Sequence, residues 1–144
     1  MKDNFEKSVE FVLTAEGGYV NSDPGGETNY GISKRAYPWL DIKNLGFAEA
    51  KEIYFNDYWL LAGCDKLQWP MCLVQLDTAV NMGVGQANKM LKQLSGLSQS
   101  QGVAAYLTMR KKYYESIAGS GRNAHFVNGW LNRLRRLSNY IESH

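Results

Sequence analysis

Residues 16–32 carry the sequence EGGYVNSDPGGETNYGI, and this stretch decides the fold of the N-terminal part of the chain. Glycine directly after a periodic apolar segment is typical of a helix end, so the Gly-Gly pair indicates that a helix stops at Glu16. The run Asp23-Pro24-Gly25-Gly26 has the residue order of a tight turn. The residues on either side of that turn favour strand. The stretch therefore predicts a helix, then a hairpin, with a carboxylic acid where the two meet.

The helix before Glu16 is predicted by periodicity. Phe5, Val9, Val12 and Leu13 recur at the spacing of one helix face, and Glu16 falls on that face three turns after Phe5. Partial burial and the negative end of the helix dipole both disfavour a charged carboxylate there, and so favour the protonated form that a general acid requires. Two structural interpretations stay open: the side chain points outward, or it pairs with a basic partner.

Asp23 and Thr28 fall on the two arms of the predicted hairpin, which brings them close together and turns them toward the helix end. Glycosidic hydrolysis commonly uses two carboxyl groups on opposite sides of the scissile bond, so Asp23 is the candidate partner of Glu16. Thr28 is a candidate for positioning water. The alternatives are that Asp23 only forms the turn and that Thr28 is an ordinary strand residue.

The segment Glu16-Gly17-Gly18-Tyr19-Val20-Asn21, followed by Asp-Pro-Gly-Gly-x-Thr-x-Tyr-Gly-Ile, resembles the signature of glycoside hydrolase family 108. That family comprises N-acetylmuramidases of phage endolysins and related bacterial proteins. Residues 54–59 resemble its Tyr-x-x-x-Tyr-Trp segment, and residues 76–83 resemble its Asp-x-x-x-Asn-x-Gly segment. The resemblance is firm over about residues 5–85 and looser in the remainder.

The resemblance implies a lysozyme-like, mostly helical α+β fold, with a small hairpin lobe, a helical lobe and a cleft between them. It implies a peptidoglycan hydrolase that cleaves the β-1,4 bond between N-acetylmuramic acid and N-acetylglucosamine, with Glu16 as the catalytic acid. Asp23 and Thr28 resemble the other two members of the Glu/Asp/Thr set of phage-type lysozymes, at a tighter spacing. The residues expected to line the saccharide site are Tyr19, Asn29 and Tyr30.

Length and composition fit one compact enzyme domain. The 144 residues predict a single domain, with the helix and hairpin over about residues 4–33 and the helical lobe over about residues 46–144. Hydrophobic residues make up 44% of the chain, which is typical of a globular protein. A net charge of +2 does not by itself argue for nucleic acid, but it favours approach to anionic peptidoglycan. We expect a monomer that uses no cofactor. We also expect no metal site, because the sequence has no His/Cys cluster.

The rest of the chain predicts helices over about residues 47–59, 71–82, 86–94, 99–117 and 126–141. Asp77 and Asn81 share the apolar face of the second of these, so they either tie helices together or contact substrate. In the last helix, Arg133, Arg135 and Arg136 are expected on the faces opposite the apolar stripe. That basic surface predicts a solvated face, with contact to a membrane as the alternative.

The resemblance to endolysins implies a role in bacterial cell lysis, with synthesis in the host cytoplasm and action in the periplasm or cell wall. Charged residues interrupt the N-terminus, so no signal peptide is expected, and no apolar run has transmembrane length. Access to the wall would then depend on a holin. Cys64 and Cys72 are expected to be buried free thiols, with a disulfide as the alternative.

Two other functions stay open. The same fold with one glutamate serves a lytic transglycosylase, in which the muramic acid's own hydroxyl attacks in place of water. A non-catalytic peptidoglycan-binding or secretion-associated protein is the second alternative. An amidase or endopeptidase is disfavoured, because the sequence has neither a Cys/His pair nor a set of zinc ligands.

Overall fold

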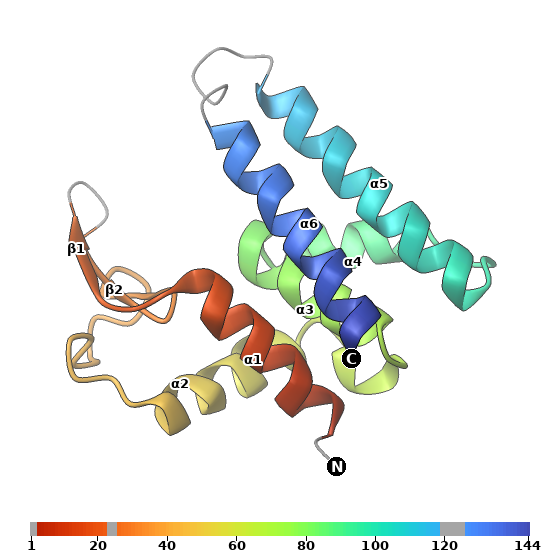
Figure 1. Cartoon of the computed structure of the whole chain (residues 1–144). Helices are drawn as coiled ribbons and strands as arrows, with labels where there is room; N and C mark the ends of the chain where they lie inside the picture. Colours follow the sequence, from red (N-terminus) through yellow and green to blue (C-terminus); the bar gives the residue numbers. More distant parts are fainter. Residues whose placement is uncertain (1–2, 23–25, 119–125) are drawn as a thin grey trace.

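The computed structural model describes residues 3–22, 26–118 and 126–144. Its elements divide between a small antiparallel sheet and a larger group of helices (Figure 1). In chain order they are α1 (Asn4–Glu16), β1 (Val20–Ser22), β2 (Gly26–Asn29), β3 (Ile32–Ser33), α2 (Phe47–Tyr54), η1 (Phe55–Trp59), η2 (Cys64–Lys66), α3 (Met71–Met82), α4 (Val84–Lys92), α5 (Gln99–Ala118) and α6 (Val127–Ser143). The mostly helical α+β, lysozyme-like architecture predicted from the sequence is confirmed.

Helix α1 begins and ends as its sequence predicts. The Asp3 carboxylate caps the first turn by accepting a 2.8 Å hydrogen bond from the Glu6 backbone N–H. The apolar face is buried against the core, with Val9 and Val12 fully inaccessible. The helix ends at Gly17, whose φ of +82° is costly for a residue with a β-carbon. The chain therefore leaves the helix directly after Glu16.

The sheet has three strands in the order β1-β2-β3, all antiparallel. Val20 pairs with Thr28, and Thr28 pairs in turn with Ser33. The first two strands match the predicted hairpin, whereas the sequence did not predict β3. The turn that creates β3 consists of Tyr30 and Gly31, which both have positive φ.

Helix α3 is the centre of the helical lobe. Every residue from 71 to 79 is buried, and the helix packs against α1, α4 and α5. Helices α5 and α6 pack side by side (Figure 1), and α5 also packs against α3. The hydroxyl of Tyr140 in α6 donates a 2.8 Å hydrogen bond to the Lys7 carbonyl in α1, so the last helix is joined to the first. This packing brings residues far apart in the sequence to the end of α1.

Two local features refine the sequence predictions. The helix predicted over residues 47–59 is α-helical only as far as Tyr54, and from Phe55 it continues as the π-helical turn η1. In this turn the Leu60 N–H donates a hydrogen bond to the Phe55 carbonyl. Cys64 and Cys72 are both buried and free, as predicted. Burial raises the pKa of both thiols, which keeps them protonated at neutral pH.

Candidate active site

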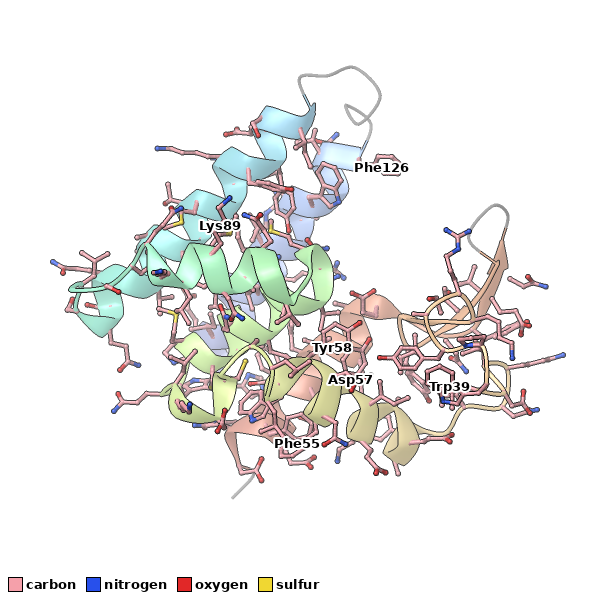
Figure 2. The ribbon with its side chains drawn as sticks, turned by 180° about the vertical axis from the view of Figure 1, so that it is seen from behind. Trp39, Phe55, Asp57, Tyr58, Lys89 and Phe126 are labelled. Atoms are coloured by element: carbon pink, nitrogen blue, oxygen red, sulfur yellow. The ribbon has the colours of Figure 1, made fainter. Side chains whose placement is uncertain are left out.

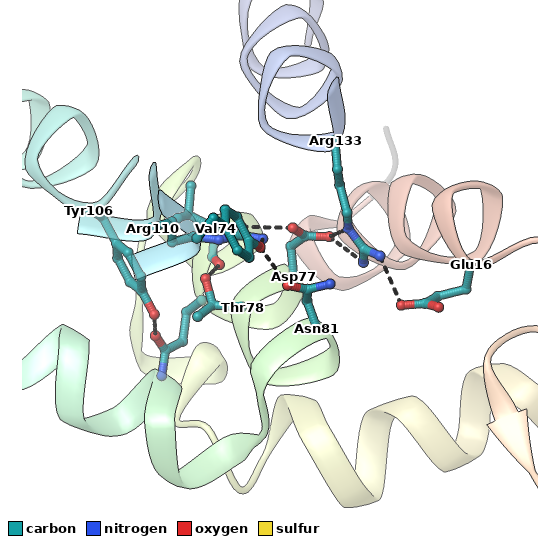
Figure 3. A network of polar contacts seen from close by, with 10 residues as sticks. Glu16, Val74, Asp77, Thr78, Asn81, Tyr106, Arg110 and Arg133 are labelled. Carbon is teal, nitrogen blue, oxygen red and sulfur yellow. Dashed lines mark hydrogen bonds and ion pairs between the residues drawn. The ribbon is translucent and has the colours of Figure 1, made fainter. Parts of the chain in front are cut away.

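Glu16 lies where the helical lobe meets the sheet, on the last turn of α1. Its side chain is 22% exposed, so the carboxyl is accessible without being fully solvated. Its Oε1 accepts a 3.0 Å hydrogen bond from Nη1 of Arg133 in α6, which is 117 positions further along the chain (Figure 3). Of the two structural interpretations that the sequence left open for Glu16, the structure therefore shows the second, in which the carboxyl pairs with a basic side chain.

Arg133 is itself held by Asp77 in α3. The Nε and Nη2 atoms of Arg133 donate to Asp77 Oδ1 at 3.1 and 2.8 Å. Asp77 is completely buried, and its Oδ2 accepts a 2.7 Å bond from Nη1 of the equally buried Arg110 in α5. One buried carboxylate thus fixes two guanidinium groups, and the guanidinium of Arg133 in turn fixes Glu16 (Figure 3).

The electrostatics of this network explain why the buried charges are tolerated. Burial alone would raise the pKa of Asp77, but Arg110 and Arg133 outweigh burial and hold the pKa below its ordinary value. Arg110 also donates a 2.8 Å bond from Nη2 to the Tyr114 hydroxyl, which donates to Asn81 Oδ1. The network therefore joins α1, α3, α5 and α6 around one ionised carboxylate.

These contacts decide two of the sequence predictions. Asp77 and Asn81 tie helices together, as the first of their two interpretations held. The prediction that Arg133 occupies an outward face was wrong, because its side chain is only 9% exposed and enters the core. The signal was present in the sequence: Arg133 falls three residues after Trp130 and four before Leu137, on the apolar stripe itself. Arg135 and Arg136 are exposed, as predicted.

Gly31 closes the site from the side of the sheet. A β-carbon at this position would lie 2.7 Å from the Tyr54 hydroxyl oxygen and 2.9 Å from both Cβ and Cγ of Glu16. The Tyr54 hydroxyl donates to the Tyr30 carbonyl, which fastens this turn to α2. The backbone at Gly31 thus forms one wall of the space that the Glu16 side chain occupies.

Gly31→Ala should lower both stability and activity. The added methyl group would clash with Glu16 and Tyr54, and φ at Gly31 is +77°. We expect a loss of about 2 kcal/mol or more in the free energy of unfolding and a clear loss of the hydrolytic activity that the family resemblance implies. Gly85→Ala is the matched control, because Gly85 lies in α4 with open space around its Cα, and it should be neutral or slightly stabilising. Thermal unfolding and an activity assay measure the two effects. Equal behaviour of the two variants would contradict the close approach of Gly31 to Glu16 and Tyr54.

Two tyrosines lie beside the carboxyl of Glu16. Burial raises the pKa of Tyr54, and the Glu16 carboxylate raises it further. Burial also raises the pKa of Tyr58, with contributions from Asp57 and Glu16. Both phenols therefore stay protonated at neutral pH, and the single hydroxyl proton of Tyr54 is the one donated to the Tyr30 carbonyl.

Three other predicted residues lie on the sheet or next to it. Thr28 is half-buried in the middle strand, and Asp23 lies outside the described residues. Tyr19 is 38% exposed, and its hydroxyl donates a 3.0 Å bond to Glu27. Asn29 is buried, and its amide donates to the Ile42 and Lys43 carbonyls, so it anchors the sheet to the following loop.

Two other kinds of feature are absent from the part of the chain that the structure describes. No group of three or more His, Cys, Asp or Glu residues in it has the arrangement of a metal site. None of the helices that the structure describes combines the length and apolar character needed to cross a membrane.

Glu16 is a partly exposed glutamate at the end of a helix, between a small antiparallel sheet and a helical lobe. This arrangement is typical of the lysozyme-like class of glycosidases. The chain belongs to the glycosyl hydrolase 108 family, whose model matches residues 9–83, slightly more than half of its length. It is therefore a glycoside hydrolase of the N-acetylmuramidase type, and peptidoglycan is the corresponding substrate.

Comparison with solved structures agrees with this membership. A structure described as that of Brucella abortus SagA is 28% identical in sequence and superposes with a TM-score of 0.68. The similarity covers 96% of this chain and 94% of that chain, so it extends well beyond residues 9–83. No curated protein matches the chain.

Proposed function

We propose that the protein hydrolyses the β-1,4 bond between N-acetylmuramic acid and N-acetylglucosamine, with Glu16 as the general acid. The observation that carries this proposal is the position of Glu16. Its carboxyl is partly exposed between the two lobes, and Oε1 is held by Arg133 while Oε2 has no such bond in the described part of the chain. Oε2 is therefore the oxygen that is available to hold a proton toward a glycosidic oxygen.

The reaction then follows from these positions. Glu16 transfers its proton to the glycosidic oxygen as the bond from that oxygen to the anomeric carbon breaks. The sugar leaves as an alcohol, and Glu16 becomes a carboxylate that Arg133 stabilises through the 3.0 Å contact. Water adds to the anomeric carbon, and its proton is released to a carboxylate.

Asp23, assisted by Thr28, is the proposed carboxylate that activates the water or stabilises the oxocarbenium charge. Thr28 pairs with Val20 in the sheet, which supports a place for Thr28 on the hairpin lobe. In the sequence, Asp23 is the residue after Ser22, the last residue of β1. Asp23→Asn should lower hydrolysis by about tenfold or more if this role is right. Unchanged hydrolysis by that variant would assign Asp23 to the turn alone.

Tyr19 and Tyr30 are the proposed saccharide contacts of the sheet. Tyr19 presents an exposed ring, and Tyr30 lies in the turn next to Glu16. The buried Asn29 amide would act indirectly, by holding this lobe in place. Substitution of Tyr19 by Ala should raise KM for glycan strands, and an unchanged KM would remove Tyr19 from the saccharide site.

In the cell, we propose a bacteriolytic role of the phage endolysin type. The protein would be made in the host cytoplasm, act as a monomer on the wall, and require a holin for access to it. Expression in a bacterial host with and without a co-expressed holin tests this role: lysis only with the holin supports it, and lysis without one contradicts the requirement.

The cleaved bond itself can be identified chemically. Digested peptidoglycan is reduced with borohydride, hydrolysed in acid and analysed for sugar alcohols. Hydrolysis at the proposed bond converts N-acetylmuramic acid ends into muramicitol. Glucosaminitol in its place would assign the opposite bond, and a 1,6-anhydro end, which borohydride does not reduce, would assign a lytic transglycosylase.

A further inference from the structure

A cavity lies on the small-lobe side of α2, outside the Glu16 network. Its volume is about 310 Å³, at the small end of the range for ligand sites. The segment that follows the sheet forms one wall, and α2 with η1 forms the other. The side chains that matter below are Tyr37, Trp39, Glu52, Asn56 and Asp57.

Trp39 is the most unusual side chain of this cavity. It is 74% exposed, the highest value among the large apolar side chains that the structure describes as exposed. Its ring and the Tyr37 ring form a T-shaped pair at 5.6 Å and 71°, and the high exposure of Trp39 leaves most of the indole surface open. An exposed single aromatic is ordinary on a protein surface, but one at the rim of a cavity offers a stacking platform.

Polar groups are arranged around this platform. The Tyr37 hydroxyl donates a 2.6 Å bond to Asp57 Oδ2, and burial together with Asp57 raises the pKa of Tyr37. Asn56 donates from Nδ2 to the Glu52 carbonyl at 3.1 Å. Asp57 and Asn56 both come from the π-helical turn η1, a type of helix interruption that is frequent at functional sites. Aromatic faces combined with carboxylate and amide groups are suited to the apolar and hydroxyl surfaces of a sugar ring.

Tyr58 connects this cavity to Glu16. It follows Asp57 in η1, interacts with both Tyr37 and Glu16, and its ring lies 5.3 Å from the ring of Tyr54. Figure 2 shows Asp57, Tyr58 and Trp39 on the same side of the molecule, with Trp39 toward the hairpin lobe. Tyr58 therefore lies between Glu16 and the residues of the cavity, with interactions toward both.

The charge of the cavity selects between the two sugars of a glycan strand. Its lining as the structure describes it includes three carboxylates, from Glu49, Glu52 and Asp57, and no Lys or Arg side chain. The Lys34 ammonium bonds the carbonyl of the lining residue Leu40 at 2.6 Å, so the carboxylates outnumber the nearby cation. N-acetylmuramic acid carries a lactyl group that ends in a carboxylate or in a peptide, which this small acidic cavity would repel or exclude. N-acetylglucosamine carries neither.

We propose that the cavity beside Trp39 is a distal subsite that binds an N-acetylglucosamine unit of the glycan strand. This assignment deepens the proposed function and rests on it. The subsite adds binding to strands that are long enough to reach from Glu16 to Trp39. It adds nothing for shorter ones.

Kinetics on glycan strands of defined length test the proposal. Peptide-free strands of two and of four or more disaccharide repeats are digested by the wild type, Trp39→Ala, Trp39→Phe and the control Leu61→Ala, whose side chain is 62% exposed and not part of the cavity. Trp39→Ala should lower kcat/KM on the long strands by about tenfold and leave the short ones unchanged. Trp39→Phe should recover most of the loss, and Leu61→Ala should match the wild type. Equal rates for Trp39→Ala and the wild type on long strands would overturn the subsite.

Binding without turnover separates this proposal from the proposed function. The indole N–H signal of Trp39 is followed by NMR in Glu16→Gln while N-acetylglucosamine or N-acetylmuramic acid is added. The first sugar should shift the signal, and the second should not. If N-acetylglucosamine shifts the signal but the wild type does not cleave peptidoglycan, the subsite is supported and the proposed hydrolysis is contradicted. If both sugars shift the signal equally, or neither does, the subsite alone is contradicted.

Discussion

Glu16→Gln should reduce peptidoglycan hydrolysis by about 10²- to 10⁴-fold, the contribution typical of a general acid. The amide keeps an oxygen that can accept the Arg133 hydrogen bond, so the network around it should persist. It has no proton that it can give to a leaving glycosidic oxygen. Turbidity clearing of purified walls gives the rate, and thermal unfolding shows that the fold is retained.

Glu115→Gln is the matched control for this substitution. Glu115 lies on the exposed side of α5, so the same chemical change there should leave hydrolysis unaltered. Wild-type clearing by Glu16→Gln would assign Glu16 a purely structural role. In that case the non-catalytic peptidoglycan-binding interpretation would gain support.

Asp77→Asn should be among the most destabilising single substitutions in the chain. It leaves two buried guanidinium groups, Arg110 and Arg133, without the carboxylate between them. Breaking a buried ion pair in this way typically costs about 3–5 kcal/mol, which corresponds to a fall in Tm on the order of 10 °C. Hydrolysis should also be slower than in the wild type at temperatures where the variant is still folded, because Arg133 loses the partner that orients it toward Glu16. Calorimetry and the clearing assay measure the two effects.

The pH dependence of stability gives a second test of Asp77. Its pKa is lower in the folded protein than the ordinary value of 3.8, so its contribution is complete above that value and is lost as the pH falls through the folded pKa. Wild-type stability should therefore decline in acid with a component that Asp77→Asn lacks. The exposed Asp65→Asn serves as control and should stay within about 0.5 kcal/mol of the wild type. A wild-type acid profile in Asp77→Asn would contradict the network.

The first part of the site could be predicted because its signals are local. Apolar spacing over residues 5–13 and the glycines after Glu16 place the acid at a helix end. Apolar spacing within α3 likewise places Asp77 on the buried face of that helix. Since buried polar groups are hydrogen-bonded, its position predicts that Asp77 has polar partners, without saying which ones. Neither argument depends on contacts that are distant in the sequence.

Arg133 shows where this reasoning fails. Charged residues in an amphipathic helix are normally assigned to solvent, and Arg133 violates that assignment because its partners lie 56 and 117 positions away. Arg110 is buried for the same reason, since its charge is compensated by a residue of α3. The third strand was missed because it is two residues long and depends on the positive φ of Tyr30 and Gly31. Hydrophobic periodicity does not report the π-helical turn, since one extra residue per turn leaves the apolar pattern readable as a helix.

Digestion of peptidoglycan in ¹⁸O-labelled water tests the central claim most directly. If Glu16 donates its proton to the glycosidic oxygen and water completes the reaction, mass spectrometry should find one ¹⁸O atom at each new N-acetylmuramic acid end. Glu16→Gln should produce few such ends. Wild-type products that lack the label and end in 1,6-anhydro sugar would contradict hydrolysis, and labelled ends formed equally by Glu16→Gln would contradict the role of Glu16.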